Sequence, residues 1–177
     1  LITTSSLLFD DQGEIRARYD KLHMFDVDIN DAHAHYRESD TYQHGQHLTV
    51  VDTPVGRLGM TICYDLRFPA LFQALRAQGA ELISVPAAFT RVTGEAHWEI
   101  LLRARAIENQ CMILAPAQVG HHGPTRRTWG HTLAVDGWGK VLAENPDAVA
   151  ALKVRVDTTS LQPLRQQMPV LQQIGRA

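Results

Sequence analysis

The most constraining feature of this sequence is an apolar run that ends at a cysteine and passes directly into helix-forming sequence. The run covers residues 58–62, the cysteine is Cys63, and the following segment 64–69 closes on Pro69. This order predicts a buried strand, a turn and a helix, with a thiol at the junction. A helix start presents unpaired N–H groups and partial positive charge, and both favour the reactive thiolate. Cys63 is therefore a candidate nucleophile, although a free cysteine is also a common core residue.

The other apolar patterns predict strands and helices in mixed order. Three hairpins are expected, pairing residues 7–9 with 15–19, 48–52 with 58–62, and 131–135 with 141–143. Further strands are expected at 82–85, 112–115 and 148–156, and helices at 69–78, 95–109 and 161–167. Hairpins combined with strand–helix–strand units favour an α/β layered fold that contains a mixed sheet.

Several connections and helix ends can also be assigned from residue type. The partly apolar stretch 21–29 and the polar stretch 30–46 read as loops, the second as a long connection. Loops of that length in compact domains are commonly functional. Gly94 and Ser160 are expected to cap the starts of the second and third helices, and Gly79 to end the first.

Composition excludes some classes of function and localisation. A net charge of −2 gives no overall basic character for nucleic acid or an anionic membrane. No apolar stretch approaches the ~20 residues that a membrane helix needs. Two cysteines at unmatched positions make no disulfide framework, so a reducing, cytoplasmic location is expected. The chain opens on Leu1 within strand-like sequence, and we expect it to be the interior of a larger protein.

The remaining chemical candidates have structural alternatives. Cys111 lies in the apolar run 111–114 and reads as an inert core thiol. From local sequence alone, Lys21 reads as an amine that extends to solvent and Glu38 as a solvated carboxylate. Glu99 is a stronger candidate for a site residue than an ordinary surface glutamate, because its neighbour Trp98 should be packed.

Nine histidines raise the possibility of a metal site. The candidate ligand pairs are His33 with His35, His44 with His47, and His121 with His122. None of them has the carboxylate or second-pair spacing of a zinc motif. No metal and no other cofactor is therefore expected.

Seven segments in sequence order carry a resemblance to a known family. They are Tyr19–Val27, Gly59–Pro69, Pro86–Phe89, Gly94–Glu99, Arg103–Asn109, Gly130–His131 and Asp136–Gly139. Together they resemble the nitrilase superfamily of carbon–nitrogen hydrolases, over nearly the whole chain. The resemblance implies an α-β-β-α sandwich, incomplete at the N-terminus, that assembles as a homodimer or higher homo-oligomer.

The resemblance also implies a catalytic site. Cys63 corresponds to the nucleophile that forms a thioester, and Lys21 with the backbone N–H of Tyr64 would stabilise the oxyanion. Glu38 matches a second glutamate that positions the lysine in related amidases. The backbone near Ala87 and Phe89 would border the substrate. Water would then hydrolyse the acyl-enzyme, so that ammonia leaves first and a carboxylate second.

The family's general-base glutamate has no match in this chain. In the family it precedes the lysine motif, where this chain offers only Glu14 in a turn. We therefore expect residues 1–177 to form a partial carbon–nitrogen hydrolase domain that lacks its N-terminal strand–helix units. We also expect this chain to be catalytically inactive as given, because thioester formation needs a group that removes the thiol proton.

Two further segments bear on the substrate. Residues 102–111 and 117–122 resemble the Nit branch, whose amides carry a carboxylate at the far end. The resemblance implies deaminated glutathione as the substrate, with ω-amidase action on 2-oxo acid amides as an alternative. Arg91, Arg126 and Arg127 are loop cations that could bind the carboxylate. A non-catalytic interaction module remains a different class of function.

Overall fold

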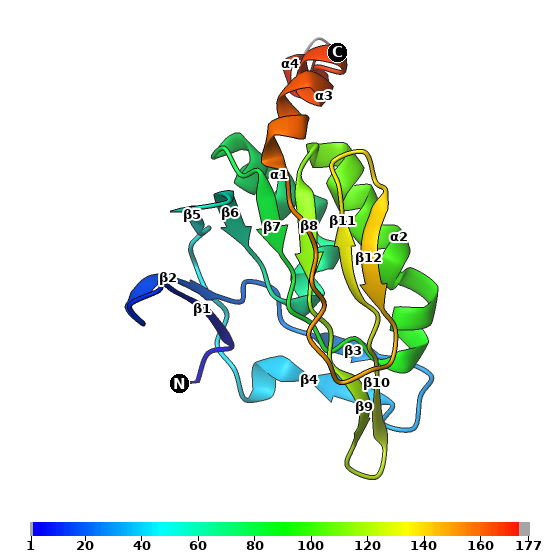
Figure 1. The fold of residues 1–177 in the computed structure, drawn as a ribbon. Coiled ribbons are helices and arrows are strands. Elements are labelled where there is room, and N and C mark those ends of the chain that lie inside the picture. Colours follow the sequence, from blue (N-terminus) through cyan, green and yellow to red (C-terminus); the bar gives the residue numbers. More distant parts are fainter. Residues whose placement is uncertain (1, 174–177) are drawn as a thin grey trace.

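A mixed six-stranded sheet forms the centre of the molecule in the computed structural model, which describes residues 2–173 (Figure 1). Its strands are β5 (Val50–Thr53), β6 (Gly56–Met60), β7 (Leu82–Ser84), β8 (Met112–Ala115), β11 (Thr132–Val135) and β12 (Val141–Asn145). They lie in the order β12-β11-β8-β7-β6-β5. β6, β7 and β8 are parallel, and the other neighbours pair antiparallel. The expected mixed sheet and the second and third hairpins are confirmed.

Two helices cover one face of this sheet (Figure 1). α1 (Pro69–Ala77) begins at a proline, whose fixed φ suits a first helical turn, and α2 spans Arg91–Asn109. Apolar side chains of both helices pack against alternate residues of the central strands, including Ile83 and Ile113. Because these are the residues with helical and strand periodicity in the sequence, the main core follows from the pattern.

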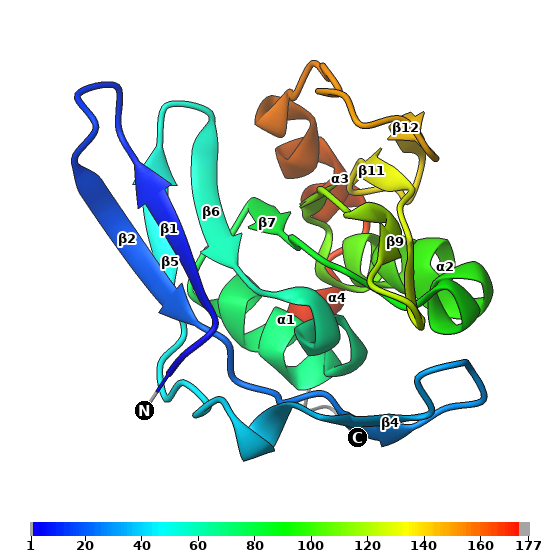
Figure 2. The ribbon, with the colours of Figure 1, turned by 90° about the horizontal axis from the view of Figure 1, so that it is seen from below.

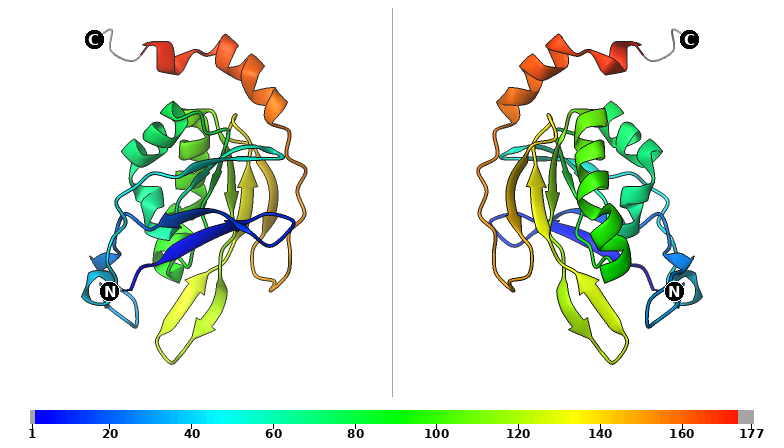
Figure 3. Two further views of the ribbon diagram at one scale, coloured as in Figure 1. Left: turned by 90° about the vertical axis from the view of Figure 1, so that its left-hand side faces the viewer. Right: turned by 90° about the vertical axis from the view of Figure 1, so that its right-hand side faces the viewer.

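The opposite face of the sheet is covered by a hairpin and by the C-terminal segment. The hairpin joins β1 (Ser5–Phe9) to β2 (Ile15–Asp20), and it lies alongside β5 and β6 (Figure 2). The chain after β12 runs the length of the sheet before α3 (Leu161–Gln167) and α4 (Val170–Gln173) (Figure 3). Leu161 packs there against Leu82 and Met112, the alternate residues of β7 and β8.

Two short hairpins lie at one end of the sheet (Figure 1). One joins β3 (Asp26–Asp28) to β4 (His35–Arg37) and leads into a 3-10 turn at Glu38–Asp40; the other joins β9 (Val119–His122) to β10 (Arg126–Trp129). They meet where His33 Nδ1 lies 3.3 Å from Thr125 Oγ1.

The prediction that residues 21–46 contain only loops was wrong. The Asp28 carboxylate on β3 contacts two side chains of β4, with Oδ1 lying 2.7 Å from His35 Nδ1 and 2.8 Å from the nearer Arg37 guanidinium nitrogen. Cross-strand polar pairs hold these three-residue strands together, so they leave no apolar alternation to detect.

The start of α2 also differs from expectation. The helix begins four residues before the predicted start at residue 95, and its N-cap is Thr90, whose hydroxyl accepts a hydrogen bond from the Thr93 N–H at 3.3 Å. Gly94 therefore lies inside the helix rather than capping it. A Cβ there would lie 2.3 Å from the Trp129 Cβ, so the glycine allows β10 to approach the helix.

Two C-terminal predictions need correction. Residues 148–156 form no strand in the described structure, although exposure alternates along residues 151–156 as it would in a strand. A strand needs a partner for its N–H and C=O groups, and alternation alone does not supply it. Ser160 occupies the predicted N-cap position of α3, but its side chain makes no capping hydrogen bond. Its hydroxyl donates instead to the Asp157 carbonyl at 2.8 Å.

Candidate active site

A large cavity lies where the three parallel strands end. Segments that follow β6, β7 and β8 line it, including Cys63, Pro86 and Pro116, and its volume is about 1220 Å³. Ligand sites in open α/β sheets commonly lie outside the carboxyl ends of the strands. The position of Cys63 after β6 therefore places the thiol in the part of the fold most suited to binding a small molecule.

Cys63 occupies a strained position at the end of its strand. Its φ angle is +51°, in the left-handed region that non-glycine residues seldom adopt. The Cys63 N–H donates to the Pro86 carbonyl at 2.9 Å, and a 3-10 helix starts at the cysteine and runs to Arg67. α1 starts only at Pro69. The predicted strand–turn–helix is thus confirmed, with a short 3-10 helix between the thiol and the α-helix.

Burial works against the thiolate that the helix start was expected to favour at Cys63. Burial raises the pKa of the Cys63 thiol, while the charge of Lys21 and the backbone N–H of Ala88 lower it by less. The negative charges of Glu38 and Asp65 add smaller increases. A five-residue 3-10 helix also contributes a weaker dipole than a long α-helix would. The thiol therefore needs a base or a bound substrate to lose its proton.

Lys21 and Glu38 form an ion pair at the cavity wall. The Lys21 side chain is only 3% exposed and that of Glu38 16%. The Lys21 Nζ donates to Glu38 Oε2, which also accepts the Phe25 N–H at 2.7 Å. Both local interpretations from sequence, a lysine extending to solvent and a solvated glutamate, were wrong, because tertiary contacts pair the two charges.

Seven of the nine residues assigned to the site from sequence come together. The residues that line the cavity are Lys21, Glu38, Cys63, Tyr64, Ala87, Phe89 and Arg126. Arg91 and Arg127 are not among the described lining residues. Arg91 lies over the Trp129 ring at 5.8 Å, and Arg127 is exposed on β10. Their proposed contact with substrate is therefore corrected in favour of other cations.

Three arginines line the cavity, of which Arg126 was expected from sequence and Arg37 and Arg67 were not. Arg37 pairs with Asp28 at 2.8 Å. Arg67 is half-buried, and its guanidinium lies 5.3 Å from the Phe89 ring centre and 3.4 Å from His97 Nδ1. Arg126 reaches the cavity from β10. No carboxylate among the described residues lies within ion-pair distance of Arg67 or Arg126. The sequence signal for Arg67 was its place four residues after Cys63, one turn along a helix from the thiol.

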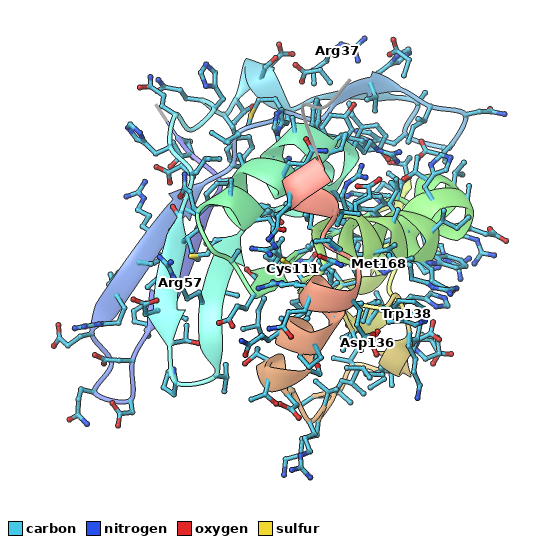
Figure 4. The ribbon with its side chains drawn as sticks, turned by 90° about the horizontal axis from the view of Figure 1, so that it is seen from above. Arg37, Arg57, Cys111, Asp136, Trp138 and Met168 are labelled. Carbon is cyan, nitrogen blue, oxygen red and sulfur yellow. The ribbon has the colours of Figure 1, made fainter. Side chains whose placement is uncertain are left out.

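The other candidates lie away from the cavity. Cys111 is fully buried beneath the C-terminal helices (Figure 4), and its burial raises the pKa of the thiol to about 11, as expected of an inert core residue. Glu99 is exposed and pairs with Arg103 at 3.2 Å, so it is a surface residue of α2 and not part of the site. In residues 2–173, no three His, Cys, Asp or Glu side chains are grouped to hold a metal ion.

The profile of the carbon-nitrogen hydrolase family matches residues 2–166. The chain belongs to this family. The fold agrees with that of the solved NitFhit protein, to which the chain is similar. Within residues 2–173, no helix combines the length and the apolar character that a membrane span requires.

Individual relatives agree with this assignment. The deaminated glutathione amidase of Yersinia enterocolitica is 80% identical over 172 residues, which are 97% of this chain and 60% of the relative. The chain thus spans about 60% of the length of this curated relative. The crystal structure of the Caenorhabditis elegans NitFhit protein is 44% identical, with a TM-score of 0.85 over 96% of this chain and 41% of that one.

A third relative concerns the cysteine directly. A variant of the amidase from Nesterenkonia sp. AN1 is 27% identical, with a TM-score of 0.75 over 93% of this chain and 61% of that chain. Its crystal structure shows the result of Michael addition of acrylamide at the active site cysteine. A relative of this fold thus carries a cysteine that reacts with an electrophilic amide.

Proposed function

We propose that this chain supplies the nucleophile and the oxyanion site of an amidase that acts on a small amide bearing a carboxylate. The observation that carries the proposal is the convergence of Cys63, Lys21 and Glu38 on one cavity from three separate segments. The 80% identity to a deaminated glutathione amidase supports the same reaction class.

The geometry gives each group a role in acyl transfer. The Cys63 sulfur attacks the amide carbon, and the carbonyl oxygen becomes an oxyanion next to the Lys21 ammonium and the Tyr64 N–H. Collapse of this intermediate breaks the C–N bond, the leaving amine takes up the proton that the thiol gave up, and a thioester remains on Cys63. Water then attacks the thioester, which releases the acid and restores the thiol.

Glu38 holds the lysine in this scheme. Its Oε2 accepts hydrogen bonds from the Lys21 Nζ and the Phe25 N–H, and its Oε1 accepts one from the Thr4 hydroxyl at 3.4 Å, so both oxygens are engaged. It is also the only carboxylate among the described residues that line the cavity. Glu38 is therefore a positioning residue, and the cavity described here lacks a second carboxylate to serve as general base.

The cations at the cavity suit a substrate with a carboxylate. Arg67 lies near the nucleophile in sequence, and Arg126 reaches the cavity from the β9–β10 hairpin. Deaminated glutathione retains carboxylates at both ends of an internal amide, and Arg67 and Arg126, the lining cations that pair with no described carboxylate, fit it. Its leaving group is a peptide amine, so the release of ammonia expected from the resemblance applies only to a simple carboxamide such as a 2-oxo acid amide. The ω-amidase reaction remains the alternative.

Assembly and location complete the proposal. Ile100 on α2 is 70% exposed and Val92 46%, and both lie on the helix side that faces away from the sheet. Apolar exposure of this kind supports a homodimer through the helical layer. Two cysteines, Cys63 and Cys111, are free, which supports a reducing cytoplasmic location. Light scattering of the purified chain and cell fractionation test these two statements.

Selective alkylation tests the proposed nucleophile without requiring turnover. The chain is treated with iodoacetamide and the labelled cysteines are identified by mass spectrometry. We expect Cys63 to be labelled and Cys111 to be spared, because only Cys63 faces the cavity. Glutaramate, an amide with a carboxylate, should slow the labelling more than butyramide, which has none. Equal labelling of both thiols, or no protection, would refute the proposal and favour an interaction module.

A further inference from the structure

Asp65 is a fully buried carboxylate that accepts four hydrogen bonds. Its donors are the Tyr19 hydroxyl at 2.7 Å, the Ile62 N–H at 2.9 Å, and the backbone N and ring Nδ1 of His23 at 3.1 and 2.7 Å. An isolated buried carboxylate is costly, and a full set of donors offsets that cost. Asp65 does not line the cavity, so the catalytic scheme above leaves this network unexplained.

The donors occupy specific places along the chain. Tyr19 and His23 lie two residues before and two residues after Lys21. Ile62 precedes Cys63, and Asp65 itself follows Cys63 by two residues. One carboxylate therefore binds the segment that carries the ammonium to the turn that carries the thiol.

Further contacts make the connection rigid. The His23 ring stacks on Phe68 with centroids 3.6 Å apart and planes 7° from parallel. The Tyr19 hydroxyl, while donating to Asp65, also accepts the Leu22 N–H at 3.3 Å. Both sides of Lys21 are thus fixed against the segment 62–68, which is separated from it by about forty residues of chain.

We infer that Asp65 is a positioning residue that sets the placement of Lys21 relative to Cys63. This inference rests on the proposed roles of those two residues. It assigns Asp65 no contact with substrate. Asp65 affects the reactivity of Cys63 through the position of Lys21.

Whether loss of Asp65 speeds or slows the reaction of Cys63 distinguishes a positioning role from a purely electrostatic one. The charge of Asp65 raises the pKa of Cys63, and that of Lys21 lowers it by a larger amount. Removing the Asp65 charge alone would therefore make Cys63 more reactive. Removing Asp65 and thereby displacing Lys21 would make Cys63 less reactive, because the larger contribution is lost.

Alkylation kinetics of the 177-residue chain test the inference. We compare wild type, Asp65→Asn and the control Asp136→Asn, in which the replaced carboxylate also accepts two backbone N–H groups, at 2.9 Å each, in the β11–β12 turn. Below the thiol pKa, Asp65→Asn should slow the iodoacetamide reaction of Cys63 about 10-fold, which corresponds to about one pKa unit. Asp136→Asn should leave the rate unchanged.

Tyr19→Phe provides a second variant if Asp65→Asn does not fold. It removes one donor to Asp65 without changing any charge, and it should slow the reaction about 3-fold, a smaller loss because three donors remain. A faster reaction of folded Asp65→Asn, or unchanged rates in folded Asp65→Asn or Tyr19→Phe, would overturn the inference. An unreactive Cys63 in wild type would instead refute the proposed function, so the two failures are distinct.

Discussion

Lys21 and Glu38 form a nearly buried ion pair although 17 residues separate them in sequence. The pair links the segment after β2 to the 3-10 turn after β4. A buried ion pair often adds little net stability, but removing one partner leaves the other charge unpaired in a poorly solvated site. The pair therefore keeps an ammonium at the cavity that the sequence, read locally, would have placed in solvent.

Glu38→Ala should lower the free energy of unfolding by about 3 kcal/mol, because it leaves Lys21 buried without its partner. Urea unfolding followed by circular dichroism measures this. Glu99→Ala is the matched control, since Glu99 pairs with Arg103 on the surface and should cost less than about 1 kcal/mol. Equal losses in the two variants would show that the Lys21–Glu38 pair is solvated.

The rate of Cys63 alkylation should rise with pH through a midpoint above the ordinary thiol pKa of about 8.5, because burial raises the pKa of Cys63. Lys21→Met should move the midpoint higher still, since the lysine charge lowers that pKa. Initial rates between pH 6 and about 11, a span that brackets the ordinary thiol pKa, give both midpoints. A wild-type midpoint near neutrality would contradict the assignment of burial as the dominant cause.

Cys111 should make the fold less stable at alkaline pH. Burial raises the pKa of its thiol to about 11 in the folded chain, against about 8.5 when unfolded. The folded state therefore binds the Cys111 proton more tightly than the unfolded state does. The stability that this protonation contributes is fully present below the pKa of the unfolded thiol and is lost as the pH rises through the pKa of the folded thiol. The midpoint of thermal unfolding is measured against pH for Cys63→Ala and for the double variant Cys63→Ala with Cys111→Ala. The two curves should diverge above about pH 8.5, and parallel curves would count against the prediction.

Arg126 and Arg127 are neighbours on β10, yet only Arg126 lines the cavity. Arg126→Ala should weaken protection of Cys63 by glutaramate about 10-fold, as expected for the loss of a charged hydrogen bond. Arg127→Ala should leave it unchanged and serves as the control. The concentration of glutaramate that halves the alkylation rate reports both effects, and equal weakening would mean that only the overall charge of the hairpin matters.

The 177-residue chain should show no steady turnover of small amides, because Glu38 is the only described carboxylate on the cavity and it is engaged with Lys21. Ammonia release from glutaramate, measured over hours, tests this. Turnover that disappears in Cys63→Ala would show that Glu38, a lining histidine (His33 or His122) or a group away from the described lining acts as the base.

Much of the scaffold could be predicted from local sequence. The strands around Ile83 and Ile113, the helix that follows Pro69 and the β11–β12 hairpin appear where apolar periodicity and turn residues place them. The inert character of Cys111 also follows from its apolar neighbours. These features depend on interactions within a few residues, which a single sequence displays directly.

The site itself depended on the tertiary structure. Glu38, Asp65 and Arg126 have ordinary local surroundings, and only long-range packing places them at or beside the cavity. The segment 148–156 carries a strand-like pattern but finds no partner, since hydrogen bonding between strands is not encoded by one segment alone. The sequence determined which segments are buried and where a thiol would be presented. The fold decided which charges face that thiol, because the energy of a buried charge is set by the neighbours that other parts of the chain bring to it.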